Sequence, residues 1–332
     1  MNPTLLSGYL AKAIPRNYPV LLAGKPGIGK TDIITAAAEA AGAELIISHP
    51  VVSDPTDFKG LPFPTGDGRA EFLPYGDLER LAKAEHKTVF FLDDLGQASI
   101  SVQAACMQLI LARQINGHRV SNNVEFLAAT NRKIDRAGVS AFLEPLKSRF
   151  FSILKLDVSA KDWVKWAETH EMPPELIAYI QFNPAALEDA KPNADLENSV
   201  SPRTLAHLGR QQTDGLDPEE EAEVFAGAVG EAFAIEYRNF LALCRQMPRL
   251  DAIIADPGRA MVHPNASVMY AISGGLARIM NDANIGPICT YLDRVEPELS
   301  VACMINATNR NPQLKNNREY AVWVGQHHKA II

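Results

Sequence analysis

Residues 24–31 read Gly-Lys-Pro-Gly-Ile-Gly-Lys-Thr, which has the G-x-x-x-x-G-K-[ST] spacing of a loop that binds phosphates. The three glycines let the backbone turn tightly and point N–H groups at phosphate oxygens. The lysine places a positive charge between the β- and γ-phosphates, and the threonine offers a hydroxyl to Mg²⁺. The pattern predicts a site for a nucleoside triphosphate and Mg²⁺. Its residues are Gly24, Lys25, Pro26, Gly27, Ile28, Gly29, Lys30 and Thr31.

The segments on either side have the character that such a loop requires. Residues 19–23 are a short apolar run suited to a buried parallel strand, and residues 31–40 favour a helix that ends near Gly42. The loop is therefore expected to connect a strand to a helix, whose positive N-terminal end also attracts phosphate.

Two adjacent aspartates follow a second apolar run, at residues 88–92. Ligands of open α/β sheets lie outside the carboxyl ends of the strands. We expect Asp93 to bind the Mg²⁺ ion and Asp94 to orient the attacking water, as in a Walker B pair. The alternative is a strand that ends in two solvated aspartates. The phosphate loop upstream favours the functional interpretation.

Three further polar residues follow predicted elements. Asn131 comes after the strand-like run 124–129, where its amide could position water beside the γ-phosphate or end the strand through a turn. Arg149 enters the run 150–156 and could reach a neighbouring subunit's γ-phosphate as an arginine finger. Spacing alone favours a simpler role for Arg149, as a cation at a helix C-terminus. For Arg203, in the first turn of a predicted helix, the sequence alone predicts a solvated side chain.

In this order, the motifs resemble those of the AAA+ ATPases, most closely the MoxR-like and dynein-related group. The resemblance covers roughly residues 15–210. It implies that Asn131 is sensor 1, that Arg149 is the arginine finger acting on a neighbouring subunit, and that Arg203 is sensor 2. The implied catalytic residues are Asp94, Asn131, Arg149 and Arg203, and the implied Mg²⁺ ligands are Thr31 and Asp93.

Two further segments are similar to inserts of this group. Asn116-Gly117, between strand-like pairs, is the signal of a two-residue type I′ hairpin, and it lies where the group carries a hairpin before sensor 1. The segment from residues 54–60 through residues 72–76 resembles the insert in the family's second helix. It is rich in proline and glycine, which predicts loops and a hairpin rather than a helix. The resemblance implies that both inserts face the pore of a ring.

The chain departs from the family pattern at two places. The second Walker B acid of the family is usually glutamate, and Asp94 is one methylene shorter. A shift of about an ångström in a catalytic group can lower the rate about 10²-fold, so we expect slow hydrolysis or a need for a partner. The family's usual Asn-Arg after the acids is replaced by Leu95-Gly96-Gln97, which argues against its usual signalling between subunits.

Composition narrows the classes of partner. The chain has 332 residues, of which 47% are hydrophobic, and its net charge of −7 does not favour nucleic acid as a partner, although a local basic pore is compatible with it. The four cysteines lack C-x-x-C spacing and predict buried thiols in a reducing compartment. No apolar run approaches the length of a membrane span, so we expect a cytoplasmic protein that binds no membrane.

We expect an α/β fold, a P-loop NTPase of the AAA+ type with a sheet of five parallel strands. The strands are predicted near residues 19–23, 44–48, 88–92, 124–129 and 150–156. They belong to a large ATP-binding domain at residues 1–157, followed by a helical lid at 158–249 and a helical C-terminal extension of unknown role at 250–332. In the helical part we expect a loop at 186–200, one helix from Asp217 to about Met247, and helices at 266–280 and 287–304.

The expected function is Mg²⁺-dependent hydrolysis of ATP by a homo-oligomeric ring, expected to be a hexamer. Like MoxR-like chaperones, the ring would remodel a protein client, which the sequence does not identify. Two alternatives stay open. A motor or loader that depends on nucleic acid would use Lys59, His118 and Arg119 in the pore to contact phosphates. A nucleotide-gated assembly protein with slow turnover would follow from the short side chain of Asp94.

Overall fold

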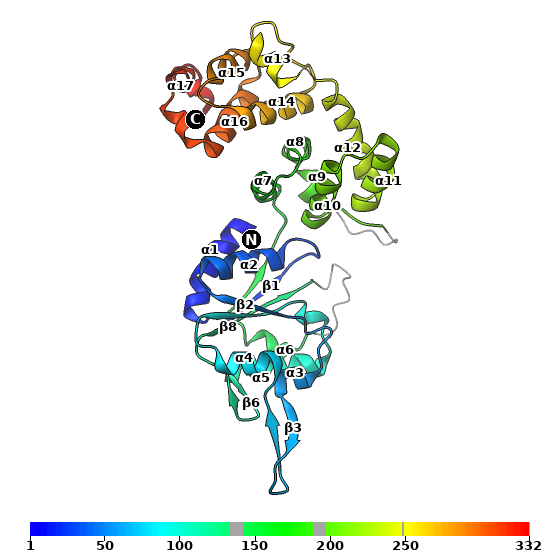
Figure 1. Cartoon of the computed structure of the whole chain (residues 1–332), viewed down its shortest axis with the longest axis vertical. Helices are drawn as coiled ribbons and strands as arrows, with labels where there is room; N and C mark the ends of the chain where they lie inside the picture. Colours follow the sequence, from blue (N-terminus) through cyan, green and yellow to red (C-terminus); the bar gives the residue numbers. More distant parts are fainter. Residues whose placement is uncertain (133–141, 189–196, 248, 332) are drawn as a thin grey trace. The chain divides into compact units, whose positions relative to one another are not determined.

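The computed structural model describes residues 1–132, 142–188, 197–247 and 249–331 (Figure 1). The chain divides into two compact units. The first contains Met1–Asp162 together with Ser201–Arg203, and the second contains Trp163–Val200 and the residues from Thr204 onward. Most of the residues expected as a lid and as an extension thus lie together in the second unit, and the domain boundaries expected at residues 157 and 249 stay predictions.

The first unit is built on a sheet of five parallel strands in the order β2-β5-β8-β1-β9. The strands are β1 (Val20–Ala23), β2 (Glu44–Ser48), β5 (Thr88–Leu92), β8 (Val124–Thr130) and β9 (Ser152–Lys155). The five predicted strands and their parallel arrangement are confirmed. Every residue of β5 and β8 is buried, as expected for central strands of a parallel sheet that is covered on both faces.

Helices cover the two faces of this sheet. One face packs against α1 (Pro3–Arg16) and α2 (Lys30–Ala40), in a core that includes Leu127 of β8. The next side chain back along the strand, Phe126, lies in the core on the opposite face, because successive residues of a strand point to opposite sides. The helices of that second face are α3 (Pro55–Lys59), α4 (Gly76–Lys83), α5 (Ile100–Ala112) and α6 (Glu144–Lys147).

Two hairpins belong to the first unit. They are formed by β3 (Leu61–Pro64) with β4 (Ala70–Leu73), and by β6 (Gln114–Ile115) with β7 (His118–Arg119). Asn116 and Gly117 have φ angles of 48° and 87°, and a type I′ turn requires positive φ at both positions, so the predicted hairpin is confirmed. At the other insert the hairpin also forms, but the prediction that no helix occurs there was wrong. The short α3 forms because Asp54 and Asp57 make a capping box at its N-terminus.

Beyond the sheet the described chain is helical. The helices are α7 (Ala160–Thr169), α8 (Pro174–Phe182), α9 (Ala185–Glu188), α10 (Pro202–Thr213), α11 (Pro218–Val229), α12 (Glu231–Cys244), α13 (Leu250–Ala255), α14 (Ala266–Ile279), α15 (Ile285–Leu292), α16 (Pro297–Arg310) and α17 (Arg318–Ile331).

Three predicted boundaries in this helical part were wrong. The single helix expected from Asp217 to Met247 is divided at Gly230, whose φ of 88° is not helical. The expected run 287–304 is likewise divided between α15 and α16. The expected loop at 186–200 begins inside α9, and its residues 189–196 lie outside the described residues.

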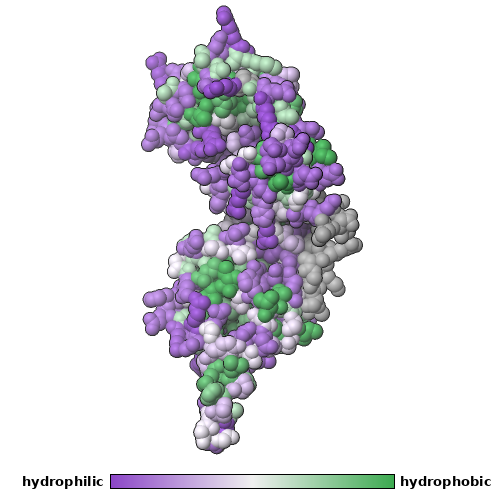
Figure 2. Space-filling model, turned by 45° about the vertical axis from the view of Figure 1, so that its right-hand side comes forward, coloured by the Kyte–Doolittle hydropathy of each residue, from purple (hydrophilic) through white to green (hydrophobic). Residues whose placement is uncertain are grey.

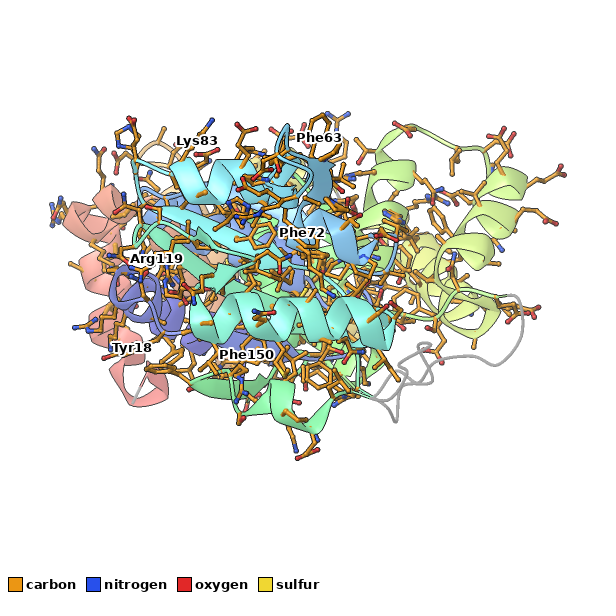
Figure 3. All side chains as sticks on the ribbon, turned by 90° about the horizontal axis from the view of Figure 1, so that it is seen from below. Tyr18, Phe63, Phe72, Lys83, Arg119 and Phe150 are labelled. Carbon is orange, nitrogen blue, oxygen red and sulfur yellow. The ribbon has the colours of Figure 1, made fainter. Side chains whose placement is uncertain are left out.

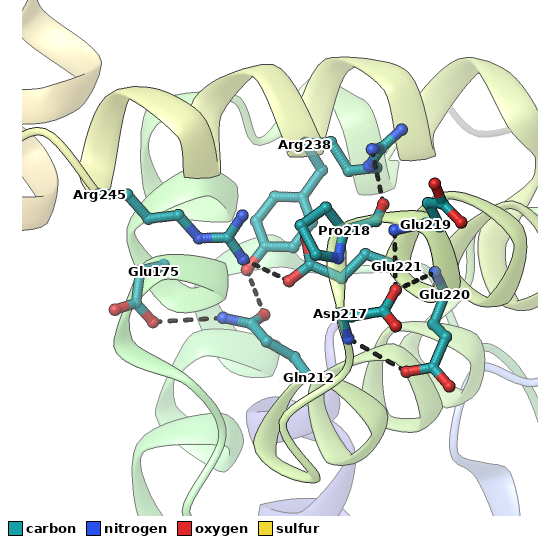
Figure 4. Close-up of polar contacts among 10 residues, drawn as sticks. Glu175, Gln212, Asp217, Pro218, Glu219, Glu220, Glu221, Arg238 and Arg245 are labelled. Atoms are coloured by element: carbon teal, nitrogen blue, oxygen red, sulfur yellow. Dashed lines mark hydrogen bonds and ion pairs between the residues drawn. The ribbon is translucent and has the colours of Figure 1, made fainter.

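A polar network links α10, α11 and α12 within the second unit (Figure 4). Glu221 is 5% exposed and pairs with Arg245, which prevents an uncompensated buried carboxylate. The hydroxyl of Tyr237 donates to Gln212 Oε1 at 2.6 Å, and Gln212 Nε2 donates to Glu175 Oε2 at 3.4 Å. These contacts fix the three helices to one another and to α8, the helix that carries Glu175.

The cysteines behave as the sequence predicts. All four are buried and free of disulfides. Burial raises the pKa of the Cys244 and Cys289 thiols to about 12, so both stay protonated and unreactive at neutral pH. Among the helices of the described part of the chain, none is long and apolar enough to cross a membrane.

Candidate nucleotide site

The loop at residues 24–31 leaves β1 and enters α2, as predicted. Gly27 and Gly29 have φ angles of 71° and 91°, a region that only glycine enters without strain. Gly29 is also the N-cap of α2 and has no side chain to cap the first N–H groups of the helix. The loop therefore offers a helix N-terminus and a cradle of main-chain N–H groups, which suits a phosphate.

Lys30 is 7% exposed and directs its ammonium group back into the loop. Its Nζ donates to Gly24 O at 3.2 Å, to Lys25 O at 3.1 Å and to Asn131 Oδ1 at 2.7 Å. The positive charge is thus already placed at the loop, on carbonyl and amide oxygens that phosphate oxygens can replace.

Thr31 and Asp93 form the second part of the site. Thr31 Oγ1 donates to Asp93 Oδ2 at 2.9 Å, and Asp93 Oδ1 accepts from the backbone N–H of Asp94 at 3.0 Å. A hydroxyl and a carboxylate oxygen in contact are the hard oxygen donors that Mg²⁺ prefers. The donor set therefore fits the ion that the sequence predicts at these two residues.

Asp94 lies in a strained turn directly after β5. Its φ is 54°, in the left-handed region, and its Oδ1 accepts from Gln97 Nε2 at 2.9 Å and from Asn131 Nδ2 at 3.2 Å. Sequence reasoning predicted Asp94 and Asn131 here but treated Gln97 only as a departure from the family pattern. No spacing rule would have placed the Gln97 amide on this carboxylate.

Asn131 joins the two halves of the site. It follows β8, is 8% exposed, and contacts Lys30 through its oxygen and Asp94 through its nitrogen. Because β8 lies between β5 and β1 in the sheet, its carboxyl end falls between the Walker B acids and the phosphate loop. The strand order thus explains why one amide can bridge both.

Arg149 does not join this group. It lies between α6 and β9, where Phe151 N donates to Pro19 O ahead of β1, and its Nη1 donates to Ser148 Oγ at 3.0 Å. Because β9 runs parallel to β1, Arg149 lies at the end of the sheet opposite the phosphate loop. A strand of four residues separates these ends by about 13 Å, so Arg149 is poorly placed to act on a nucleotide in its own chain.

Arg203 lies beside the phosphate loop, although more than 170 positions separate the two in the sequence. Its backbone N–H donates to Gly27 O at 3.1 Å, and its side chain is exposed. Any Cβ at Gly27 would come within 2.8 Å of Ser201 Oγ. The exposed side chain agrees with the solvated arginine that the sequence alone predicts, and the sensor 2 role implied by the family resemblance stays a prediction.

Comparisons with known proteins agree with this geometry. Residues 20–158 match the AAA family, the ATPase family associated with various cellular activities. Among solved structures, the chain is similar to the RuvB Holliday junction branch migration motor of Thermotoga maritima, with a TM-score of 0.40 and 21% identity over 82% of this chain and 80% of that one. It is also similar to NtrX from Brucella abortus in complex with ADP, with a TM-score of 0.40 and 13% identity over 99% and 68%. The match to the AAA family is confined to residues 20–158, and the P-loop AAA+ fold expected from the sequence is confirmed.

Proposed function

We propose that this chain hydrolyses ATP with Mg²⁺ at sites shared between neighbouring copies in a ring, and uses the cycle to remodel a protein partner. The observation that carries the proposal is the hydrogen-bonded set of Lys30, Asn131 and Asp94 at the carboxyl end of the sheet, next to the Thr31–Asp93 pair. We place this activity in the cytoplasm, which the four free, buried cysteines support.

Each residue has a role that follows from its chemistry. Lys30 and the loop N–H groups bind the phosphates, and Thr31 with Asp93 would hold the Mg²⁺. When bound, the ion neutralises negative charge on the β- and γ-phosphates. Asp94 orients the attacking water and accepts its proton, and Asn131 positions the same water without adding charge.

The shared site rests on the placement of Arg149. At the far end of the sheet from its own loop, Arg149 is better placed to serve a neighbouring copy, as an arginine finger does. A surface that acts on a different surface of the next copy generates a closed ring when the rotation closes, and a hexamer is our proposal for its size. Arg203, beside Gly27, would report the state of the nucleotide to α10, the helix in which it lies.

The two hairpins are the proposed contact with the partner. They are tied together, because Asn116 Nδ2 donates to Lys59 O at 2.9 Å and the His118 ring hydrogen-bonds to Phe72 O. The hairpin formed by β3 and β4 projects from one end of the first unit (Figure 1) and exposes large apolar side chains. These are Leu61, Phe63, Phe72 and Leu73, each 39–59% exposed. Figure 2 shows an apolar patch near this end, and Figure 3 labels Phe63 and Phe72. An exposed apolar hairpin fits a polypeptide partner better than a phosphate backbone.

A specific observation also supports nucleic acid as a second candidate. Lys59, His118 and Arg119 lie on the same two joined inserts. If nucleic acid is the partner, it should stimulate the ATPase, and the stimulation should fall steeply as salt rises. A third candidate is nucleotide-gated assembly with slow ATP hydrolysis. It predicts that Asp94→Glu raises the rate of hydrolysis, because the longer side chain brings the carboxylate closer to the attacking water.

Lys30→Ala tests the proposal directly. Removing the ammonium group should abolish the heat that calorimetry detects when ATP and Mg²⁺ are added to the wild type. Lys83→Ala, which removes an exposed lysine from α4, should bind as the wild type does. Circular dichroism confirms that both variants are folded. Equal ATP affinity in the Lys30→Ala variant and the wild type would refute the proposed site.

A further inference from the structure

We propose that Gln97 is a positioning residue for Asp94, which keeps the carboxylate oriented when nucleotide occupies the site. The inference rests on the proposed ATPase function. It concerns a side-chain contact of Asp94 that comes from outside the motifs of the family, the hydrogen bond from Gln97 Nε2 to Asp94 Oδ1.

The two donors to Asp94 are not equivalent. Asn131 Oδ1 also accepts a hydrogen bond from Lys30 Nζ at 2.7 Å. This bond is shorter than the bond of 3.2 Å that Asn131 Nδ2 donates to Asp94 Oδ1. Lys30 is the residue that phosphate attracts most strongly, so nucleotide binding disturbs Lys30 and Asn131 together. Gln97 contacts neither the loop nor Lys30 through any hydrogen bond described in the structure. Its bond is therefore the one that can persist in both states.

The backbone holds Gln97 in place. It ends the 3₁₀ turn η1 (Leu95–Gln97), and its N–H donates to Asp94 O at 2.9 Å, so main chain and side chain bind the same residue. Leu95 is fully buried, and a Cβ on Gly96 would come within 2.1 Å of Thr130 Oγ1. The turn is thus packed against the end of β8 and leaves the Gln97 amide little freedom.

The hydrogen bond from Gln97 matters because the side chain of Asp94 is short. The Asp94 carboxylate is one bond from Cβ and lies on a left-handed residue, so its direction depends on that strained turn and on its donors. A misplacement of about 1 Å can lower a rate about 10²-fold. Gln97 would therefore affect turnover while leaving the binding of phosphates to the loop unchanged.

Gln97→Met is the sharpest variant. Methionine keeps the length of the side chain and removes the donor, and it also removes Gln97 Oε1, a buried acceptor that has no hydrogen-bond partner among the described residues. The fold should therefore be retained, and Gln97→Ala provides a second variant. The matched control is Gln108→Ala, because Gln108 is exposed on α5 and lies outside the proposed nucleotide site and the two hairpins.

We expect kcat to fall about 10-fold or more in Gln97→Met, with KM for ATP and calorimetric ATP affinity within about twofold of the wild type. Independently of turnover, the ¹⁵N-labelled side-chain amide signal of Gln97 should move in the nucleotide-free Asp94→Ala variant. A wild-type kcat in both Gln97 variants, or an unmoved amide signal, would overturn the role of Gln97 alone. No turnover by the wild type would instead refute the proposed function.

Discussion

At the scale of single residues, the charged side chains of the site are held by hydrogen bonds to neutral groups. Lys30 is buried on carbonyl and amide oxygens, and Asp94 accepts from two amides. A buried ion without partners would be costly, and these contacts offset part of that cost. Phosphate oxygens can replace the carbonyl and amide oxygens on Lys30 one at a time.

Glu125, on β8, gives a prediction about stability and pH. It is fully buried, and its two carboxylate oxygens have no hydrogen-bond partner among the described residues. Burial raises the pKa of Glu125 to about 8, although Lys87 and Arg113 oppose the shift. Because the unfolded chain ionises near pH 4.5 and the folded chain near pH 8, folding binds a proton between these values. Stability should therefore fall as pH rises through this window.

Glu125→Gln removes this titration, so the variant should gain stability relative to the wild type from pH 5 to pH 8. The gain is at most about 1.4 kcal/mol per pH unit, the full effect of one proton. Urea unfolding at both pH values measures it, with Glu79→Gln, an exposed site on α4, as the control. A difference between variant and wild type that does not change with pH would show that Glu125 is ionised in the folded chain.

The sequence predicts single residues only where type and spacing carry a mechanism. The loop glycines, Lys30 and Asp93 could be predicted because phosphate and Mg²⁺ demand them at those positions. Gln97 could not, since its contact depends on the packing of a 3₁₀ turn against Thr130. The contact of Arg203 with Gly27 links distant parts of the chain and leaves no local signal.

At the scale of elements, short apolar runs identify the five strands because buried parallel strands have few polar positions. Helix ends are harder to predict. The residues on either side of Gly230 favour helix, and one glycine costs only about 1 kcal/mol in a helix interior, so its positive φ is not evident from composition. The short α3 was missed because a five-residue helix lacks periodicity and depends on its caps.

The base of the β3–β4 hairpin depends on the backbone conformation of Gly60. Gly60 has φ 82° and ψ 169°, a conformation essentially limited to glycine, and a Cβ there would come within 2.6 Å of Leu73 O. Gly60→Ala should therefore cost about 1–3 kcal/mol of local stability, detected as faster proteolysis of the hairpin. Gly66→Ala is the matched control, because a Cβ at Gly66 meets nothing within 4 Å. Equal cleavage rates in the two variants would contradict the argument.

At the scale of the whole molecule, the residues of the proposed site lie at two separate places in the first unit. Lys30, Asp93, Asp94 and Asn131 gather at one end of the sheet, while Arg149 lies at the other. The proposed ring resolves this separation, because the arginine of one copy completes the site of the next. The proposed ring rests on the spacing along β1 and β9, and it does not depend on how the two units of the chain are arranged.

Mixed rings test this sharing. Lys30→Ala should lose ATP binding, whereas Arg149→Ala should bind ATP and lose turnover about 10³-fold, as expected when an arginine finger is removed. The two variants are coexpressed with different tags, and rings that contain both are purified through both tags. In these rings the Arg149→Ala subunit supplies Lys30, and a neighbouring Lys30→Ala subunit supplies Arg149. About one quarter of the sites in randomly mixed rings would then be complete, and phosphate release should reappear at a comparable fraction of the wild-type rate.

The control replaces the Arg149→Ala partner with the double variant Lys30→Ala, Arg149→Ala. Every subunit in these control rings lacks Lys30, so the rings should stay inactive. Sedimentation velocity with a slowly hydrolysed ATP analogue shows whether both preparations form the same assembly. Mixed rings that assemble normally and remain as inactive as the control would exclude a shared site. Wild-type turnover by Arg149→Ala alone would also exclude it, because each chain would then complete its own site.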